Sequence, residues 1–366
     1  MSLLKSAPAR TPIRTIFTLL LALAAAALCV RLRTPLPWMI GPLVVTAVVS
    51  MLGGPTASYT PLRNIGQWTI GTALGLYFTP QVVALVASLW WAVALNIVWA
   101  LALGLWFGAW LYRVHHGPGR FHLRDLSRTT TYFAAPIGAA SEMTMMGERH
   151  GAQTDLVASA HSLRVLLVTL IIPFGFQWAG LHGLDLVPPG PRVVQWGGLA
   201  LLAGLTGVGC WAMLLLKRTN PWFIGALLVS LLLTANSITL SAIPQWLTNA
   251  AQLVIGVSLG VRFTRGFVHR APRWMASVAL STVVMIGLCA SVAWGLAQFT
   301  PIHWATLLLG TSPGGIAEMA ITAKVLQLGV PVVTAFHVTR LAAVLLLAEP
   351  MYRWFYSSSD GFNAVK

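Results

Sequence analysis

The chain has 366 residues, of which 57% are hydrophobic and only 8% charged, and its mean hydropathy is +0.77. A soluble domain usually carries about 25% charged residues, so this composition excludes an ordinary water-soluble protein. The net charge of +15 comes from Lys and Arg residues that fall mostly between apolar segments. Orientation in a bilayer explains such charges better than nucleic-acid binding does. The three cysteines lie inside apolar segments without pairing or metal-ligand spacing, so we expect neither a disulfide framework nor a zinc site.

Long apolar stretches recur along the whole chain and predict an all-α polytopic membrane protein with about 10–12 transmembrane helices. We interpret the first stretch as a retained helix and not as a cleaved signal, because 194–216 occupies the equivalent place before the second half. The candidate segments lie near 16–31, 36–53, 64–78, 81–112, 129–147 and 154–179, and near 194–216, 221–240, 248–263, 275–299, 303–326 and 331–356.

Two sequence patterns occur once in each half and indicate a duplication. A Pro-Trp-x-Ile-Gly run at 37–41 matches the run at 221–225, and each opens a helix where proline costs least. Gly71 and Gly75 match Gly256 and Gly260, a spacing that lets helix backbones approach closely. We therefore predict a cytoplasmic tail over 1–15, a first membrane repeat over 16–180, a linker over 181–193, a second membrane repeat over 194–356 and a tail over 357–366.

Loop charges predict that the two repeats are inverted. In the first half the basic loop lies between the fourth and fifth segments, whereas in the second half it lies between the third and fourth. Positive loops mark the cytoplasmic side, so equivalent loops face opposite sides, an arrangement common in secondary transporters. Inversion needs an odd number of crossings, so one of six segments per half must be re-entrant or must not span. The loop arginines are Arg113, Arg120, Arg124 and Arg128, and Arg262, Arg265, Arg270 and Arg273.

The chain carries one set of buried ionisable residues twice, at the same spacings of 19 and 3 residues. Charges inside a membrane are costly and are by default hypotheses for functional sites. His and Arg three residues apart share one face of a helix. The two sets are Glu142, His161 and Arg164, and Glu318, His337 and Arg340.

Each glutamate follows a Pro-Gly interruption of its apolar segment. Proline and glycine are the residues least able to continue a helix, so we expect broken or re-entrant helices whose half-helix ends meet near the bilayer midplane. The alternative is a plain kink stabilised by neighbouring helices. The residues expected to line this site are Pro136 and Gly138, and Pro313, Gly314 and Gly315.

Two interpretations of the repeated set remain open. In the functional one, the glutamates are coupling carboxylates, the histidines are titratable partners, and the arginines anchor an anionic group or bridge to the glutamates. In the structural one, a buried Glu–Arg bridge with a histidine neighbour locks adjacent helices. Lys324, six residues after Glu318, has no lysine counterpart in the first half and is a candidate asymmetric coupling element.

The Pro-Trp-x-Ile-Gly run, the glycine segment and the Pro-Gly…Ser-Glu-Met/Ala-Glu-Met signature resemble the AbrB-duplication family of bacterial inner-membrane proteins over residues 30–356. This is not the family of the soluble DNA-binding protein called AbrB. Its members are labelled as regulators of gene expression or as ammonia monooxygenases. The segment around Pro313 is similar, more distantly, to broken helices of the bile-acid symporter and cation/proton antiporter superfamily. That resemblance implies crossed broken helices and alternating access, in a multi-pass inner-membrane protein.

The sequence favours a transporter over an oxygenase. An oxygenase needs clustered metal ligands, and His115 and His116 are adjacent in what we interpret as a solvated basic loop. We therefore expect a non-enzyme without cofactor or metal: a proton- or cation-coupled secondary transporter of a small solute, with an anionic solute among the candidates. The alternative is a membrane-embedded regulator that acts indirectly. Expected partners are bilayer lipid and a small-molecule or ion substrate but no nucleic acid. A homodimer stays open, and the N-terminus is expected in the cytoplasm.

Overall fold

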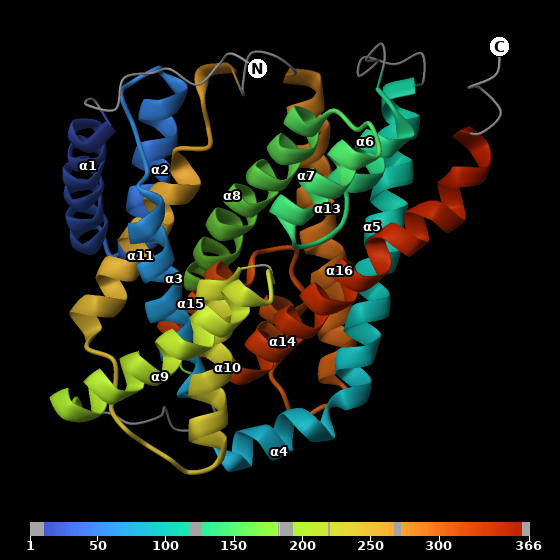
Figure 1. Ribbon diagram of the computed structural model, residues 1–366. Helices are drawn as coiled ribbons and strands as arrows, with labels where there is room; N and C mark the ends of the chain where they lie inside the picture. Colours follow the sequence, from blue (N-terminus) through green and yellow to red (C-terminus); the bar gives the residue numbers. More distant parts are fainter. Residues whose placement is uncertain are drawn as a thin grey trace. The chain divides into compact units, whose positions relative to one another are not determined.

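The computed structural model describes residues 11–116, 126–181, 183, 193–218, 220–266 and 272–360. Over these ranges the chain forms fifteen helices and no strand (Figure 1). Six of the described helices are long and apolar enough to cross a membrane, which confirms the all-α, multi-pass class. They are α1 (Thr11–Arg31), α5 (Trp90–His116), α8 (Thr154–Trp178), α9 (Trp196–Leu215), α13 (Pro272–Ala297) and α16 (Val330–Asp360).

The chain divides into two compact units, and each unit takes helices from both repeats. The first unit covers Met1–Pro80 and Pro189–Arg270, and the second covers Gln81–Pro188 and Ala271–Lys366. Besides α1 and α9, the first unit holds α2 (Pro37–Met51), α3 (Thr60–Gly75), α10 (Pro221–Ala235) and α11 (Gln245–Gly260). The second unit adds α4 (Pro80–Ser88), α6 (Arg128–Ala134), α7 (Ala140–Arg149), α14 (Trp304–Thr311) and α15 (Ile316–Val325).

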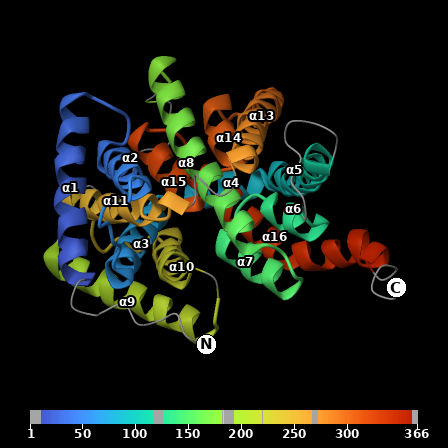
Figure 2. The same cartoon turned by 90° about the horizontal axis from the view of Figure 1, so that it is seen from above.

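In the first unit, α2 and α10 begin in the same way. Pro37 and Pro221 are the first helical residues, where a missing N–H costs least. The residues before them, Leu36 and Asn220, are left-handed, with φ of 47° and 48°. The matching turns confirm that the repeated run marks equivalent helix starts. Seen from above, α2, α3, α10 and α11 pack together, with α1 and α9 along their outer sides (Figure 2).

The repeated glycines are packing residues of this unit. A Cβ at Gly71 of α3 would collide with the backbone oxygen of Phe223 on α10. In the equivalent place, a Cβ at Gly256 of α11 would collide with the backbone oxygen of Met39 on α2. Backbone contact this close in a membrane protein requires the smallest side chain. The helix-packing interpretation of these glycines is therefore confirmed.

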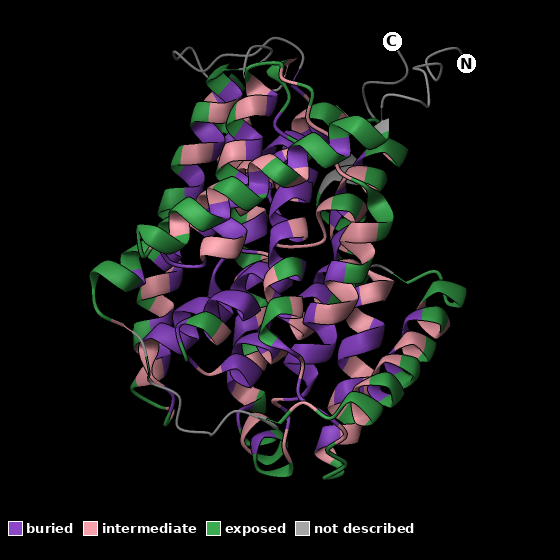
Figure 3. Ribbon diagram, turned by 90° about the vertical axis from the view of Figure 1, so that its left-hand side faces the viewer, coloured by how far each residue is buried: buried purple, intermediate pink, exposed green. Residues whose placement is uncertain are grey.

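The outer helices of the first unit present apolar surface. α1 and α9 bury only 17% of their most apolar stretch, whereas α16 of the second unit buries 56%. Figure 3, with α1 toward the viewer, shows exposed and half-buried residues along the nearest helices. Apolar helices with this exposure are suited to lipid and not to water.

In the second unit, the equivalent helices α5 and α13 run in opposite directions (Figure 1). His115, near the C-terminal end of α5, lies 2.8 Å from the hydroxyl of Ser277, near the N-terminal end of α13. Antiparallel placement of equivalent helices is what inverted repeats require. His115 is fully buried within α5, so its interpretation as a solvated loop residue was wrong, whereas His116 is exposed at the last position of the helix.

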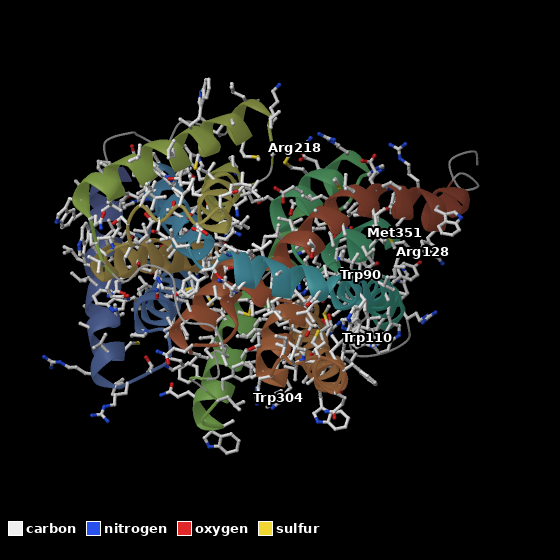
Figure 4. All side chains as sticks on the ribbon, turned by 90° about the horizontal axis from the view of Figure 1, so that it is seen from below. Trp90, Trp110, Arg128, Arg218, Trp304 and Met351 are labelled. Carbon is white, nitrogen blue, oxygen red and sulfur yellow. The ribbon has the colours of Figure 1, made fainter. Side chains whose placement is uncertain are left out.

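Tryptophans mark both ends of α5 (Figure 4). Trp90 begins the helix and is 70% exposed, and Trp110 lies 20 residues further along it. At 1.5 Å per residue the two side chains are about 30 Å apart along the helix axis, close to the thickness of the hydrocarbon core. Tryptophan favours the membrane interface, but Trp91, Trp99 and Trp106 lie on the same helix, so the length and apolar composition of α5 are what support a full crossing.

The fifth segment of each half is interrupted at its Pro-Gly run, as expected. The segment at 129–147 consists of α6 and α7, which we call hairpin 1, and the segment at 303–326 consists of α14 and α15, hairpin 2. The four helices have 7, 10, 8 and 10 residues, so none is long enough to span a bilayer.

A repeated hydrogen bond closes each hairpin at its base. The backbone N–H of Gln153, after α7, donates to the Thr130 hydroxyl of α6 at 2.9 Å. The N–H of Gly329, after α15, donates to the Thr306 hydroxyl of α14 at 3.2 Å. Each chain segment therefore returns to the side from which it started and is re-entrant. Five of the six expected segments per half remain, an odd number, as inversion requires. Among the described helices, three of them in each half are long and apolar enough to cross a membrane by themselves.

Several expected boundaries change. α1 begins at Thr11, so the expected tail over 1–15 is partly helical, and α16 continues to Asp360, past the expected end of the second repeat. The rest of both tails, and most of the expected linker over 181–193, lie outside the described residues.

We predict that Gly256→Ala and Gly71→Ala each lower the free energy of unfolding by about 1–3 kcal/mol, because the added methyl group must displace backbone. Gly204→Ala is the matched control, since a Cβ there meets nothing within 4 Å. It should leave stability unchanged or raise it by up to about 1 kcal/mol. Chemical denaturation in detergent measures all three. Equal effects of Gly256→Ala and Gly204→Ala would contradict the packing role.

Candidate functional site

The two hairpins place equivalent residues at a constant offset of 176, and both begin with a capped helix. The hydroxyl of Ser127 accepts the N–H of Thr130 at the start of α6, and the Nδ1 of His303 accepts the N–H of Ala305 at the start of α14. Side-chain caps of this kind satisfy N–H groups that the helix itself leaves without partners. The caps therefore fix where each hairpin enters.

The tips of the hairpins, residues 135–139 and 312–315, interrupt the helices in two different ways. In tip 1, Gly138 and Ala139 are left-handed, with φ of 97° and 53°. In tip 2, Gly315 has an ordinary extended backbone with φ of −80°. A left-handed conformation costs alanine about 1–2 kcal/mol. The two tips are thus equivalent in place but not in backbone conformation.

At tip 1, the backbone carbonyls are bound by side chains of α8. Arg164 donates from Nη1 to the oxygen of Pro136 at 2.8 Å and from Nη2 to the oxygen of Ala134 at 2.7 Å. The Nε2 of His161 lies 2.9 Å from the oxygen of Phe133. The last carbonyls of α6 have no helical partner, so these donors complete the helix end in a place where water is scarce.

Tip 2 repeats the pattern with side chains of α16. Arg340 donates to the oxygens of Ser312 at 2.6 Å and Gly314 at 2.9 Å, and the Nε2 of His337 lies 2.8 Å from the oxygen of Leu309. Pro136 and Ser312 are equivalent at the offset of 176, as are Phe133 and Leu309. A two-fold pattern therefore extends to individual hydrogen bonds.

The hydrogen bonds of His337 fix its protonation in this conformation. Arg340 Nη2 lies 2.9 Å from His337 Nδ1, and a guanidinium can only donate. Nδ1 is therefore the acceptor, and Nε2 carries the hydrogen that is donated to Leu309. Both ring nitrogens of the neutral imidazole are used in binding the tip. The site therefore gives His337 a positioning role here, and its predicted titration remains untested.

Both glutamates occupy the third position of the second half-helix. Glu142 is in the first turn of α7 and Glu318 in the first turn of α15, and neither helix has a side-chain cap from its N-cap residue. A carboxylate in the first turn is favoured by the partial positive charge of the helix N-terminus. The carboxylate of Glu318 folds back against Gly315, where a Cβ would collide with it. Glu318 is 8% exposed, whereas Glu142 is half-buried.

The two tips lie on consecutive turns of one helix. Arg164 of α8 holds tip 1, and Val168, one turn further along α8, contacts the place that a Cβ at Gly314 of tip 2 would take. Residues from both repeats are therefore brought to one site inside the second unit.

The structure brings most of the sequence-predicted residues together at the tips but places Lys324 away from them. The five break residues form the two tips, and both arginines and both histidines bind them. The guanidinium bonds run to backbone carbonyls, a partner that neither predicted role of the arginines included. Lys324 lies in the last turn of α15, about 9 Å along the helix from Glu318, and its equivalent in the first half is Glu148.

Sequence reasoning missed the residues that close the hairpins, Thr130 and Thr306, and the caps that open them, Ser127 and His303. The signal was available, because each pair has the same offset of 176 as the ionisable sets. It is weak, since threonine and serine are common in membrane helices.

We predict that Arg340→Lys lowers the free energy of unfolding by about 1–3 kcal/mol, because an ammonium cannot bind both carbonyls as a planar fork does and leaves one buried acceptor unsatisfied. Arg353→Lys is a matched control on the same helix. Arg353 is 67% exposed and pairs with Glu349 at 2.6 Å, so its replacement should change stability by less than about 0.5 kcal/mol. Detergent unfolding curves compare the two. If the variants unfold alike, Arg340 does not hold the tip.

Known proteins match the chain over most of its length. The family model described as "Transition state regulatory protein AbrB" matches residues 38–356. A protein of Escherichia coli (strain K12) named "Putative regulator AbrB" is 26% identical over 328 residues, which cover 87% of this chain and 90% of that protein. The protein YhjN of Bacillus subtilis (strain 168) is 25% identical over 342 residues, 86% of each chain. No solved structure matches. The chain therefore belongs to the AbrB family of membrane-helix-rich proteins.

Proposed function

We propose that this protein is a secondary transporter that moves a small solute across the bacterial inner membrane, coupled to a proton or another cation. The observation that carries the proposal is the pair of equivalent re-entrant hairpins whose tips lie on consecutive turns of α8. Non-helical backbone at membrane depth persists where it is buried in protein or lines a polar cavity. Inverted repeats with interrupted helices that converge on one site are the usual design of such transporters.

The roles of the residues follow from their contacts. Glu142 and Glu318 are the groups we assign to coupling, because an acid at a half-helix N-terminus can exchange a proton without breaking the tip. Arg164 and Arg340, with the two histidines, are positioning residues that keep the tip carbonyls satisfied. Lys324 stands apart from the tips and has no assigned part in the coupling.

The name of the Escherichia coli relative favours a second candidate, a role in gene regulation. A membrane protein of this design would exert that effect indirectly, through the concentration of the solute that it moves or senses. In that case the ionisable sets have a structural role only. We further propose that the N-terminus is cytoplasmic and that the protein is not an enzyme.

Replacing each acid separates the candidates. We predict that Glu142→Gln and Glu318→Gln each reduce coupled flux by roughly tenfold or more, the effect of losing an interaction of about 1.4 kcal/mol. Purified protein in proteoliposomes, with an imposed pH or sodium gradient and a solute panel, measures the flux. Glu148→Gln is the matched control, an exposed acid on the same helix as Glu142, and should keep full flux.

Expression level and detergent unfolding of each variant accompany the flux measurement. Full flux in both Glu142→Gln and Glu318→Gln would remove the coupling role. Lost flux together with lost folding would place both acids among the structural residues. Absence of flux for every solute under both gradients in the unmodified protein would contradict transport itself.

A further inference from the structure

We propose that the transported solute is a small anion with a carboxylate or other oxyanion group, which replaces the carboxylate of Glu318 at the N-terminus of α15 once that glutamate is protonated. This inference rests on the proposed function, because it names the solute class and the coupling ion of the same site. The N-terminus of α7, with Glu142, is the equivalent anion position of the first repeat.

Several carbonyls of each tip that could bind a cation already accept hydrogen bonds from the protein's own cations and histidines. Unwound carbonyls and half-helix C-termini are the usual ligands for sodium in interrupted helices. Here those carbonyls accept hydrogen bonds from Arg164 and His161 at tip 1, and from Arg340 and His337 at tip 2. The arginines act as cations built into the protein. A mobile cation would have to displace a guanidinium that is fixed to its own helix.

The N-termini of the two second half-helices, α7 and α15, attract negative charge. α7 and α15 each have ten residues, and their N-cap residues, Ala139 and Gly315, provide no side-chain cap. Helix N-termini bind anions through backbone N–H groups and the helix dipole. At α15 the carboxylate of Glu318 lies against Gly315 and fills this position, which only glycine leaves open. The protein's own carboxylate thus marks an anion position.

Two buried donors near the tips have no acceptor. The Nε atoms of Arg164 and Arg340 have no hydrogen-bond partner, and the two side chains are only 2% and 1% exposed. An unsatisfied donor on a buried cation is costly and calls for an explanation. Arg340 already binds Ser312 and Gly314, the residues just before Gly315. Its free N–H therefore belongs to the same tip as the anion position, and an oxyanion is the ligand that would satisfy it.

Charge then links the proton to the anion. With both glutamates ionised, their charges balance those of the two arginines. When a proton from the aqueous side binds a glutamate carboxylate, the tips become net positive and the carboxyl group no longer competes for the N-terminus. One anion and one proton enter together, and no other reactant is needed. The other charged or titratable groups around the tips are Arg164, His161, Arg340, His337 and Cys289.

The test measures binding first, in detergent, by the shift of the unfolding temperature at pH 5.5 and 7.5 with named probes. The anion arm uses succinate and citrate as organic carboxylates and phosphate and sulfate as inorganic oxyanions, which separates the two sources of the same chemistry. Choline and glucose are the cationic and neutral arms, and sodium chloride against choline chloride tests for a sodium site. Flux of any binding probe is then followed in proteoliposomes with a lumenal pH dye.

The expected result is an anion-dependent shift that is larger at pH 5.5, no shift with sodium, and lumenal acidification during uptake. Glu318→Gln imitates the protonated acid, so it should raise anion affinity at pH 7.5 about tenfold and remove the pH dependence, while coupled flux falls. Glu142→Gln provides the same comparison at tip 1 if the first variant fails to fold. Glu148→Gln should behave as the unmodified protein.

Different failures separate the two proposals. Binding and flux of choline, glucose or sodium without an anion effect would overturn the anion proposal and leave transport standing. Weaker anion binding in Glu318→Gln would also overturn it, since the glutamate would then assist the anion and not compete with it. No binding or flux for any probe would contradict both proposals.

Discussion

The structure of the second unit depends on one interaction, the fork of hydrogen bonds from a buried guanidinium to the carbonyls of a hairpin tip. Hydrogen bonds to charged groups contribute about 1.5–3 kcal/mol each, and a carbonyl left unsatisfied in a membrane costs at least as much. Arg164 and Arg340 each bind two such carbonyls. Without them, the chain could not stop two helices in mid-membrane and turn back. The re-entrant hairpins, the half-helix N-termini and the placement of the glutamates all follow from these contacts.

Duplication explains why the same solution occurs twice. Every hydrogen bond that closes or holds hairpin 1 at Thr130, Phe133 and Pro136 has its counterpart 176 residues later. The copies have diverged where the backbone turns, since tip 1 relies on a left-handed Ala139 and tip 2 does not. Neither repeat forms a compact unit by itself, because each unit contains helices of both repeats. Backbone contacts at Gly71 and Gly256 join helices of the two repeats in the first unit, and buried arginine and histidine bonds hold both tips in the second.

Much of the site could be predicted from the sequence, because its residues are rare in a membrane and occur twice. The spacing of Glu142, His161 and Arg164 located the tips, and the prolines located the breaks. The sequence predicted a break at each Pro-Gly run, but it could not decide between a re-entrant turn and a plain kink. A kinked helix and a closed hairpin can share one sequence pattern, and the bond from Gln153 to Thr130 distinguishes them in the structure. The partner of Arg164 was also hidden, since a carboxylate is the obvious acceptor in a sequence and a backbone carbonyl leaves no trace in it.

Cysteine labelling from the two sides of the membrane tests the account most directly. Arg128→Cys and Arg149→Cys report the two ends of hairpin 1. Gln298→Cys, in the loop between α13 and α14, reports the side from which hairpin 2 enters, and Val325→Cys reports its end; all four positions are exposed. Each variant is made after replacement of the native cysteines and is treated with a membrane-impermeant maleimide. The account predicts that the first two positions react from one side and the last two from the other. Reaction of Arg128→Cys and Arg149→Cys from opposite sides would show that α6 and α7 cross the membrane, and the account would be wrong.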